Sequence, residues 1–327
     1  MSFPKLCDAS GNPVTYLRLS VTDRCNLRCF YCVPEEGICQ STQEELLRTE
    51  EIIRLLQIAH LCGVNKVRLT GGEPLARRGI GRMVREIGKI GFRDIAMTTN
   101  GVLLHKFAPL LREAGLHRIN LSLDSLRPDR FHTITGRDYY DAVIKGLAAA
   151  RSVGLTPIKM NAVIVRGVND DEICDFVQMS AEQDDIEVRF IEYMPIGVGQ
   201  GYRDEKLVSV AEMLGRVKER YIVEALTPDD PGAPARMYRV VGGKGKFGFI
   251  SPMTQHFCND CNRLRITSDG KIKTCLFSRE EYDLLPWLRG KYGDREIADY
   301  LCQSVARKAS EIDDKYSSSR NMTRIGG

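Results

Sequence analysis

Three cysteines near the beginning of the chain have the residue type and the spacing to bind a metal. They are Cys25, Cys29 and Cys32, in the stretch SVTDRCNLRCFYCVPEEG. Three thiolates can form most of a zinc site that a distant histidine completes, or they can bind three irons of a 4Fe-4S cluster whose fourth iron stays open. Zinc sites usually use a second nearby pair of ligands, and this loop has none. The spacing therefore favours the cluster.

A second tight group of cysteines follows much later in the sequence. Cys258, Cys261 and Cys275 lie in the stretch FCNDCNRLRITSDGKIKTC. In a reducing compartment, cysteines are better explained as metal ligands and buried thiols than as disulfides. Cys62 and Cys174 fall on helical patterns, where we expect buried thiols that act as small apolar residues. The cysteines outside the two groups are Cys7, Cys39, Cys62, Cys174 and Cys302.

The composition is that of a globular protein, with 327 residues of which 28% are charged and 43% hydrophobic. No apolar run approaches the roughly 18 residues of a membrane helix, and the first residues lack the profile of a secretory signal. We therefore expect a cytoplasmic protein without a membrane partner. The net charge of +4 is too small to indicate nucleic acid, but the 47 Lys and Arg residues could still converge on one anion.

The first part of the chain alternates strand-like runs with helical patterns, which gives six β/α units. The runs begin at Tyr16, Lys66, Asp94, Arg118, Pro157 and Asp185, and the helical patterns lie around 49–59, 81–90, 103–114, 140–153 and 171–181. This alternation predicts a parallel sheet covered by helices, as an open partial barrel or a doubly wound sheet.

Polar residues late in the predicted strands, or just after them, favour the barrel, because the loops at that end carry the chemistry of barrel enzymes. They are Arg68, Thr70, Thr99, Asn100, Ser122, Asp124, Lys159, Asn161 and Glu192.

After Pro195 the alternation stops. The stretch LTPDDPGAPARM predicts a loop, and RITSDGKIKTC predicts a hairpin that turns at Asp269-Gly270. We therefore predict a partial (β/α)6 TIM-like barrel over residues 1–195 and a smaller α+β region over 196–327. The glycine-rich stretches at Gly197 and Gly242 lack the residues of a phosphate-binding loop, and we interpret them as turns.

The first cysteine group resembles the signature of radical S-adenosylmethionine (SAM) enzymes, with Tyr31 before the third cysteine and TGGEP at 70–74 after the second strand. In that family the open iron binds the amino and carboxylate groups of SAM, and an electron from the cluster cleaves SAM to a 5′-deoxyadenosyl radical. The resemblance implies the following cofactor-binding residues: Tyr31, Gly72, Glu73, Ser122 and Met194.

The second cysteine group resembles the C-terminal motif of the GTP 3′,8-cyclase family of molybdenum cofactor biosynthesis. This resemblance covers nearly the whole chain and includes the terminal Gly326 and Gly327. It implies a second 4Fe-4S cluster whose free iron meets the guanine of GTP. It also implies that the radical takes the 3′ hydrogen of the ribose, and that the ribose carbon then bonds to carbon 8. A zinc site with His256 as the fourth ligand stays open for this group.

A triphosphate carries about four negative charges, which arginines match with paired N–H donors. Lys66 and Arg68, and likewise Arg263 and Arg265, alternate so that each pair shares one strand face. A solvated strand edge is the alternative explanation of such pairs. The expected substrate-binding residues are Arg18, Lys66, Arg68, Thr99, Lys159, Arg189, Arg263 and Arg265, and the expected catalytic residues are Gly326, Gly327, Arg263 and Arg265.

The resemblance further implies an electron donor such as flavodoxin or ferredoxin and a downstream cyclic pyranopterin monophosphate synthase, and it allows a homodimer. Two other functions stay open. One is a radical SAM enzyme of another substrate class, such as a peptide-modifying enzyme. The other is an iron-sulfur electron carrier, which is disfavoured because both sites stop at three cysteines, whereas a carrier gains from a fourth.

Overall fold

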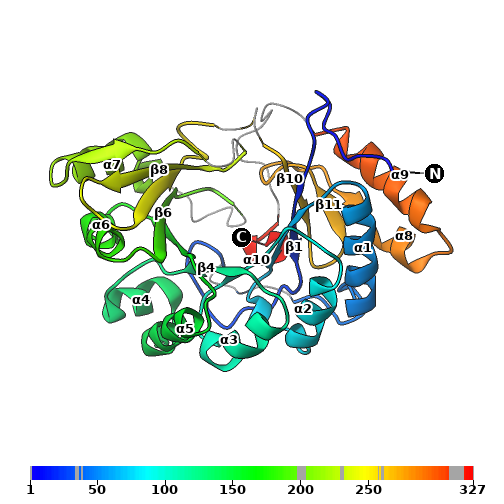
Figure 1. Cartoon of the computed structure of the whole chain (residues 1–327), viewed down its shortest axis with the longest axis horizontal. Helices are drawn as coiled ribbons and strands as arrows, with labels where there is room; N and C mark the ends of the chain where they lie inside the picture. Colours follow the sequence, from blue (N-terminus) through cyan, green and yellow to red (C-terminus); the bar gives the residue numbers. More distant parts are fainter. Residues whose placement is uncertain are drawn as a thin grey trace.

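A curved sheet of twelve strands forms the centre of the fold, in the order β12-β11-β10-β1-β2-β3-β4-β5-β6-β9-β8-β7. The computed structural model describes residues 2–33, 37, 40–196, 204–228, 232–256, 258, 261–308 and 320–326. The eight strands from β10 to β9 run parallel. Figure 1 shows this sheet as an open barrel with helices outside it and the C-terminus at its centre.

The six predicted β/α units are confirmed. Their strands are β1 (Tyr16–Ser20), β2 (Lys66–Thr70), β3 (Asp94–Thr99), β4 (Arg118–Ser122), β5 (Ile158–Ile164) and β6 (Ile186–Glu192). Their helices are α1 (Thr49–Leu61), α2 (Ile80–Gly88), α3 (Leu104–Glu113), α4 (Pro128–Thr135), α5 (Tyr140–Ser152) and α6 (Ile173–Glu182), with a short 3-10 turn at Pro74–Ala76. The sequence analysis missed α4, a helix of 8 residues that begins at a proline.

The region after residue 195 continues the same sheet at both edges. It contains the 3-10 turn Asp204–Lys206, α7 (Val210–Lys218), β7 (Val223–Ala225), β8 (Ala235–Val240), β9 (Lys246–Ile250), β10 (Arg263–Ile266), β11 (Lys271–Lys273), β12 (Tyr282–Asp283), α8 (Leu285–Arg289), α9 (Asp294–Val305) and α10 (Met322–Ile325). β10 pairs with β1, and β9 pairs with β6. A boundary at residue 195 therefore cuts the chain but not the sheet, and it stays a prediction.

Two smaller predictions in this region are confirmed and one is wrong in part. The hairpin of β10 and β11 turns at Gly270, whose φ is +77°. The glycine-rich stretch at Gly242 is the turn between β8 and β9, while the stretch at Gly197 lies outside the described residues. The predicted loop LTPDDPGAPARM is too long, because β8 already begins at Ala235, where it pairs with Ile250 of β9.

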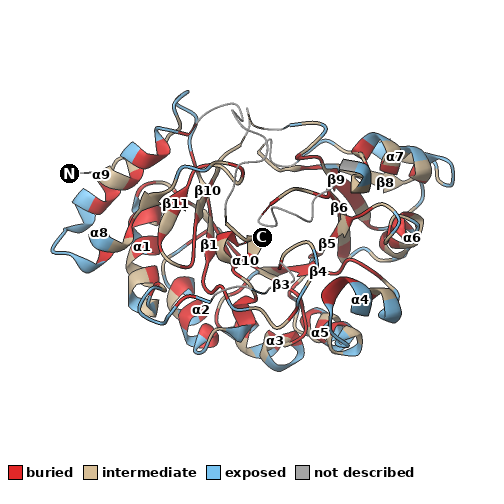
Figure 2. Cartoon of the chain, turned by 180° about the vertical axis from the view of Figure 1, so that it is seen from behind, coloured by how far each residue is buried: buried red, intermediate tan, exposed pale blue. Residues whose placement is uncertain are grey.

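Strand alternation sorts apolar residues toward the helices and polar residues toward the inside of the barrel, which we call the lumen. On β1, Leu17 and Leu19 are fully buried in the core under the helices, and Figure 2 shows the buried helix faces turned to the sheet. Arg18 lies on the opposite face, in register with Arg68 of β2 and Arg265 of β10. A barrel of this class normally fills its centre with branched apolar side chains. The lumen face of this sheet carries arginines instead, so the centre of this barrel is not a packed apolar core.

The register corrects one prediction about the lumen. Arg68 lies in the middle of β2, Lys159 is the second residue of β5, and Asn161 lies in the middle of β5. These residues are not late in their strands, because alternation fixes which face a residue lies on but not how far along the strand it lies.

Among the described helices, none is long and apolar enough to cross a membrane.

Candidate active site

The three thiols of the first cysteine group line one cavity of about 740 Å³ at the carboxyl ends of the parallel strands, as predicted for the loops of a barrel. We call it the carboxyl-end pocket. Burial raises the pKa of Cys25 to about 11, and it raises the pKa of Cys29 well above its usual value. The metal-free thiols therefore stay protonated at neutral pH, and metal binding must displace their protons. The residues that line this pocket include Cys25, Cys29, Tyr31, Cys32, Thr70, Gly71, Gly72, Thr99, Ser122, Asp124, Met322 and Thr323.

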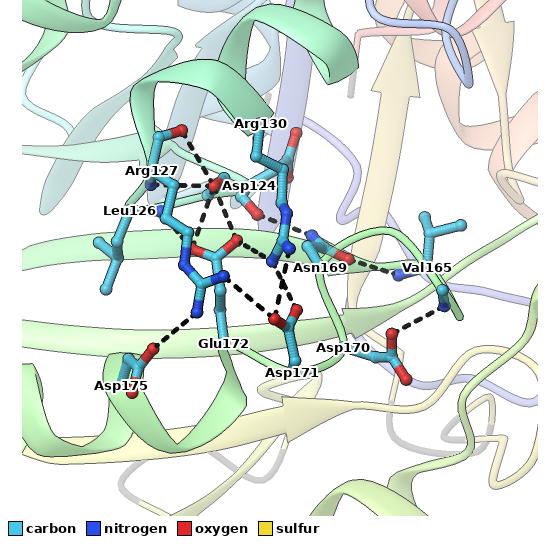
Figure 3. A network of polar contacts seen from close by, with 12 residues as sticks. Asp124, Leu126, Arg127, Arg130, Val165, Asn169, Asp170, Asp171, Glu172 and Asp175 are labelled. Atoms are coloured by element: carbon cyan, nitrogen blue, oxygen red, sulfur yellow. Dashed lines mark hydrogen bonds and ion pairs between the residues drawn. The ribbon is translucent and has the colours of Figure 1, made fainter.

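Asp124 ties the cysteine loop to the end of β5. The Tyr31 hydroxyl donates to Oδ2 of Asp124 at 2.5 Å, and the backbone N–H of Val163 donates to Oδ1 at 2.8 Å. The Asn169 amide donates to the backbone oxygen of Asp124 at 2.7 Å (Figure 3). It also donates to the backbone oxygen of Val163 at 2.8 Å. Burial raises the pKa of Asp124 to about 6. Tyr31 is thus fixed at the wall of the pocket.

A second carboxylate, Glu172, fixes the loop after β4. Its side chain is fully buried and accepts hydrogen bonds from the Ser125 hydroxyl, the backbone of Leu126 and the guanidinium of Arg130, the last two at 2.7 Å. Figure 3 shows this network and its continuation from Arg130 to Asp171. The network makes the rim of the pocket rigid, because each of its buried groups has a partner.

Two glycines let the loop after β2 lie directly against the cysteine loop. A Cβ on Gly71, whose φ is +150°, would lie 2.4 Å from the backbone oxygen of Thr22. A Cβ on Gly72 would lie 2.4 Å from the backbone oxygen of Arg24. Any side chain at either position would separate the two loops. Gly72 lines the pocket, in keeping with its predicted role at the cofactor.

Glu73 lies behind the pocket wall, not in it. The Thr99 hydroxyl donates to its Oε1 at 2.8 Å, and the backbone of Asn100 donates to Oε2 at 2.8 Å. Burial raises the pKa of Glu73 to about 7. The carboxylate therefore holds the loop after β3, and the Thr99 hydroxyl is engaged by Glu73 although Thr99 also lines the pocket.

The C-terminal tail forms part of the same wall. Met322 and Thr323 line the carboxyl-end pocket together with Ser122. Met194, predicted at the cofactor, instead packs in a small apolar cluster around Ile325. The sequence analysis missed both tail residues, and the double glycine that follows them was the one signal of a tail inside the barrel.

Gly326 lies against the lumen face of β1 and β2. Its φ is +84°, and an added Cβ would lie 2.1 Å from Oγ1 of Thr70 and 3.2 Å from Cβ of Ser20. Its backbone oxygen accepts a hydrogen bond of 3.0 Å from Arg265. Only a glycine fits this place. Gly327 lies outside the described residues.

The second cysteine group lies at the opposite end of the lumen. Cys261 precedes β10, the parallel neighbour of β1, whereas Cys25 follows β1, so the two groups flank the barrel from its amino and carboxyl ends. Around this amino-end cysteine pocket lie His256, Cys258, Cys261, Arg263, Arg265 and Cys275. Burial raises the pKa of the Cys261 thiol, but Arg263 and Lys308 together outweigh burial and lower it to about 7.

Both groups fit 4Fe-4S clusters by their donors. Each pocket presents three soft sulfur ligands around a common space, and a cluster binds each thiolate at a different iron. Within the part of the chain that the structure describes, no three His, Cys, Asp or Glu side chains are grouped closely enough to hold a single metal ion.

A third cavity, which we call the cation pocket, opens at the amino end of the lumen. It collects the cations Lys66, Arg68, Arg118, Lys159, Arg189 and Lys246, four of which were predicted to bind substrate, together with the carboxylates Asp94 and Glu187. The exceptions are Lys246 of β9 and Arg118, which alternates with Asn120 on β4 as Lys66 does with Arg68.

The cations of this pocket are buried and only partly neutralised. Glu187 lies 3.5 Å from Lys159 and 3.0 Å from Arg189. Burial lowers the pKa of Arg68 to about 9 and that of Lys159 to about 7. The Nε atoms of Arg68 and Arg189 are buried without a hydrogen-bond partner among the described residues. Such a site gains from an anion, because burying like charges without one is costly.

Arg18 was also predicted to bind substrate. It lies on the lumen face of β1, between Arg68 of β2 and Arg265 of β10. Burial, followed by the nearby Arg265, lowers the pKa of Arg18 to about 10. The arginines thus form a continuous track from the cation pocket to the amino-end cysteine pocket. Outside the sites, Cys62 is buried as predicted, whereas Cys174 is only half-buried.

Comparisons with known proteins identify two family models in the chain. Residues 19–179 match the radical SAM superfamily, and residues 186–313 match the molybdenum cofactor synthesis C-terminal family. The chain is similar to the GTP 3′,8-cyclase of Alkaliphilus metalliredigens, with 43% identity over 98% of this chain and 99% of the relative. The GTP 3′,8-cyclase of Moorella thermoacetica matches with 43% identity over the same shares.

The fold also resembles a solved structure, SuiB of Streptococcus suis bound to S-adenosylmethionine. The TM-score is 0.63, the identity is 18%, and the match covers 94% of this chain and 68% of that chain. At this identity the likeness shows the fold alone.

Proposed function

The chain belongs to the GTP 3′,8-cyclase family of radical SAM enzymes, and from that premise we infer how its residues carry the family's reaction. As a member, it uses two 4Fe-4S clusters and SAM to convert GTP into (8S)-3′,8-cyclo-7,8-dihydroguanosine 5′-triphosphate, the first step of molybdenum cofactor biosynthesis. Neither a peptide-modifying enzyme nor an electron carrier explains why 43% of the residues are identical to those of a GTP 3′,8-cyclase over 98% of the chain.

Two cysteine triads lie at opposite ends of one polar lumen, and the roles of the residues are assigned from this placement. We propose that Cys25, Cys29 and Cys32 bind the cluster that receives SAM. The backbone at Gly72, the Ser122 side chain and the fixed Tyr31 would then contact SAM, because they line the same pocket. Met194 packs in the cluster around Ile325, which supports an indirect role for it.

The second triad is proposed to hold the cluster that meets the guanine, and the arginine track is proposed to hold the triphosphate. Cys258, Cys261 and Cys275 open onto Arg263 and Arg265. The cation pocket beside them offers several buried cations to one anion, which is the charge that a nucleoside triphosphate brings. Arg118 joins the proposed set of substrate residues because it lines the same pocket, where it also pairs with Asp94.

When bound, the first cluster and SAM supply the radical chemistry that joins C3′ of the ribose to C8 of the guanine. The chain's own residues position the substrate and exclude water. The cation pocket fixes the triphosphate, and the tail closes the lumen between the two triads, where Gly326 packs on Thr70 and Ser20. Holding reacting groups in place is the part of the barrier that a protein lowers in such a reaction.

The test is anaerobic incubation of the reconstituted protein with SAM, dithionite and GTP, followed by mass analysis of the nucleotide. We expect 5′-deoxyadenosine together with cyclised GTP. Cys25→Ala should form neither, while Cys261→Ala should still cleave SAM without forming cyclised GTP. Recovery of unchanged GTP from a wild-type protein that holds both clusters and cleaves SAM would contradict the proposed function.

We also propose the setting in which the enzyme works. Its clusters need a reducing compartment and a low-potential electron donor, which supports a cytoplasmic location and a flavodoxin or ferredoxin as partner. The ten cysteines in the described part of the chain are all free thiols. A cyclic pyranopterin monophosphate synthase is proposed to take the product, and a homodimer is proposed as the assembly.

A further inference from the structure

Lys308 buries its ammonium group against the second cysteine triad. The residue is 5% exposed. Its Nζ donates to the backbone oxygen of Arg263 at 3.0 Å and to that of Cys261, and it lies 3.5 Å from Sγ of Cys261. Sequence spacing gives no hint of this contact, because the lysine lies far along the chain from the cysteine.

The position of Lys308 is set by α9. This helix packs its apolar face into the main core through Ile297 and Leu301. Arg54 of α1 forms an ion pair of 2.8 Å with Asp294 at the beginning of α9. Lys308 lies three residues beyond the end of α9, and its backbone N–H donates to the oxygen of Val305 at 2.9 Å. The side chain is thus anchored to the end of a packed helix.

The two triads have different electrostatic surroundings. At the first triad, Asp124 adds negative charge beside Cys29 and Cys32, while Cys25 lies near both Glu73 and Arg28. At the second triad, Arg263 and Lys308 both add positive charge beside Cys261. A positive charge and an N–H donor at a cluster sulfur favour the reduced cluster, because reduction adds negative charge. The two clusters should therefore differ in reduction potential.

We propose that Lys308 is a positioning residue of the second cluster, which it holds through the Cys261 thiolate and whose reduction potential it raises. The inference rests on the proposed function only in requiring a cluster at this triad. With its ammonium at Cys261, Lys308 would make a cluster bound at the second triad easier to reduce than the same cluster without the lysine.

The test is an anaerobic redox titration followed by electron paramagnetic resonance, in a protein whose first triad is changed to alanine so that only the second cluster gives a signal. Lys308→Met should shift the midpoint potential to a more negative value, and Lys308→Arg, which keeps the charge, should stay nearer the parent protein. Lys271→Met is the matched control. It removes an equal charge from β11, where Lys271 pairs with Asp283 at 2.5 Å.

If the Lys308→Met protein keeps its full iron and has the same midpoint potential and electron paramagnetic resonance spectrum as the parent protein, the inference is wrong. If that variant loses its iron, Lys308→Gln keeps an N–H donor and is titrated in its place. Iron loss from both of these variants but not from Lys308→Arg supports the holding role, and iron loss from all three contradicts it. A parent protein without a second cluster would instead refute the proposed function.

Discussion

Arg265 and Gly326 are joined by a hydrogen bond of 3.0 Å, in which Nη1 of the arginine donates to the backbone oxygen of the glycine. Burial lowers the pKa of Arg265 to about 10, so the guanidinium stays charged at neutral pH. A charged donor makes a stronger bond to a carbonyl than a neutral one. The tail is therefore held in the lumen by a residue that the sequence predicted to bind GTP.

Replacing Gly326 with alanine should displace the tail. The new Cβ would lie 2.1 Å from Oγ1 of Thr70, whose hydroxyl already donates to the oxygen of Leu19. We expect at least about a tenfold loss of cyclised GTP, which corresponds to roughly 1.4 kcal/mol of barrier, with unchanged iron. Gly242→Ala is the matched control, since its φ of +81° carries the same backbone strain in open space. Equal product from both variants would show that the fit of Gly326 is irrelevant.

Deleting Gly326 and Gly327 tests the same segment without adding a clash. Both triads and the main core lie elsewhere in the chain. Iron content and Tm should therefore stay close to those of the full chain, while cyclised GTP is no longer formed. Atomic absorption, thermal unfolding and mass analysis measure the three quantities. Turnover at the wild-type rate would mean that the two glycines do no more than end the chain.

Arg263 and Arg265 should both contribute to the binding of GTP. Replacing both with alanine is expected to weaken GTP binding by at least about 2 kcal/mol, the scale of charge-assisted hydrogen bonds, without removing iron. Arg263→Ala alone leaves the bond from Arg265 to the tail intact. Calorimetry measures the affinities, with Arg295→Ala on the exposed face of α9 as the control. Unchanged affinity in the double variant would place the phosphates elsewhere.

Lys159 should make GTP binding depend on pH. Burial, followed by the charge of Arg189, lowers its pKa to about 7, so the free protein loses this charge as the pH rises above 7. A bound triphosphate favours the charged form, and binding therefore takes up a proton in this range. Affinity should fall by up to about tenfold per pH unit above pH 7. Calorimetry in two buffers of different ionisation enthalpy measures the proton uptake, which Lys159→Met should abolish.

The lowered pKa of Lys159 also predicts how this residue affects the stability of the folded protein at different pH values. In the unfolded chain the lysine titrates near its usual value of 10.5, so between about pH 7 and 10.5 the unfolded state binds more protons than the folded state. The destabilisation caused by the buried charge of Lys159 is therefore at its full value below pH 7, and it decreases as the pH rises to 10.5. Lys159→Met should raise the Tm of the ligand-free protein most below pH 7. A constant difference in Tm across this range would rule out a titrating lysine.

Cys25→Ala separates the two clusters. The reconstituted wild-type protein should hold about eight irons, four for each cluster. The variant should keep about four and lose SAM cleavage, because Cys25 lines the carboxyl-end pocket and the second triad lies at the other end of the lumen. Iron and zinc analysis measures the outcome. A wild-type protein with one cluster and one zinc ion would contradict the two-cluster assignment.

Local patterns of the sequence were sufficient for the strands of the barrel and for the two cysteine groups. Alternation on β1 and β2 places Arg18 and Arg68 on one face, since a strand has a period of two residues. The pattern does not give the depth of Lys159 in the lumen, because depth depends on the register between β4 and β5.

Contacts between distant segments were out of reach of the same reasoning. Glu73 was expected at the cofactor from its motif, but its carboxylate turns to the backbone of Asn100. Met322 reaches the carboxyl-end pocket only because the tail folds back into the barrel. Lys308 meets Cys261 only because α9 docks on the core. In each case a pairing of two segments decides where the side chain lies, and neither segment shows it alone.

The pairing of β1 with β10 has a consequence for synthesis of the chain. A ribosome makes the first strand early, and Arg263–Ile266, the strand that covers its free edge, comes near the end. Until then β1 presents an unpaired edge on an incomplete barrel, and such edges recruit strands from other chains. Proteins cut short before residue 263 should therefore aggregate and not persist as smaller folded enzymes.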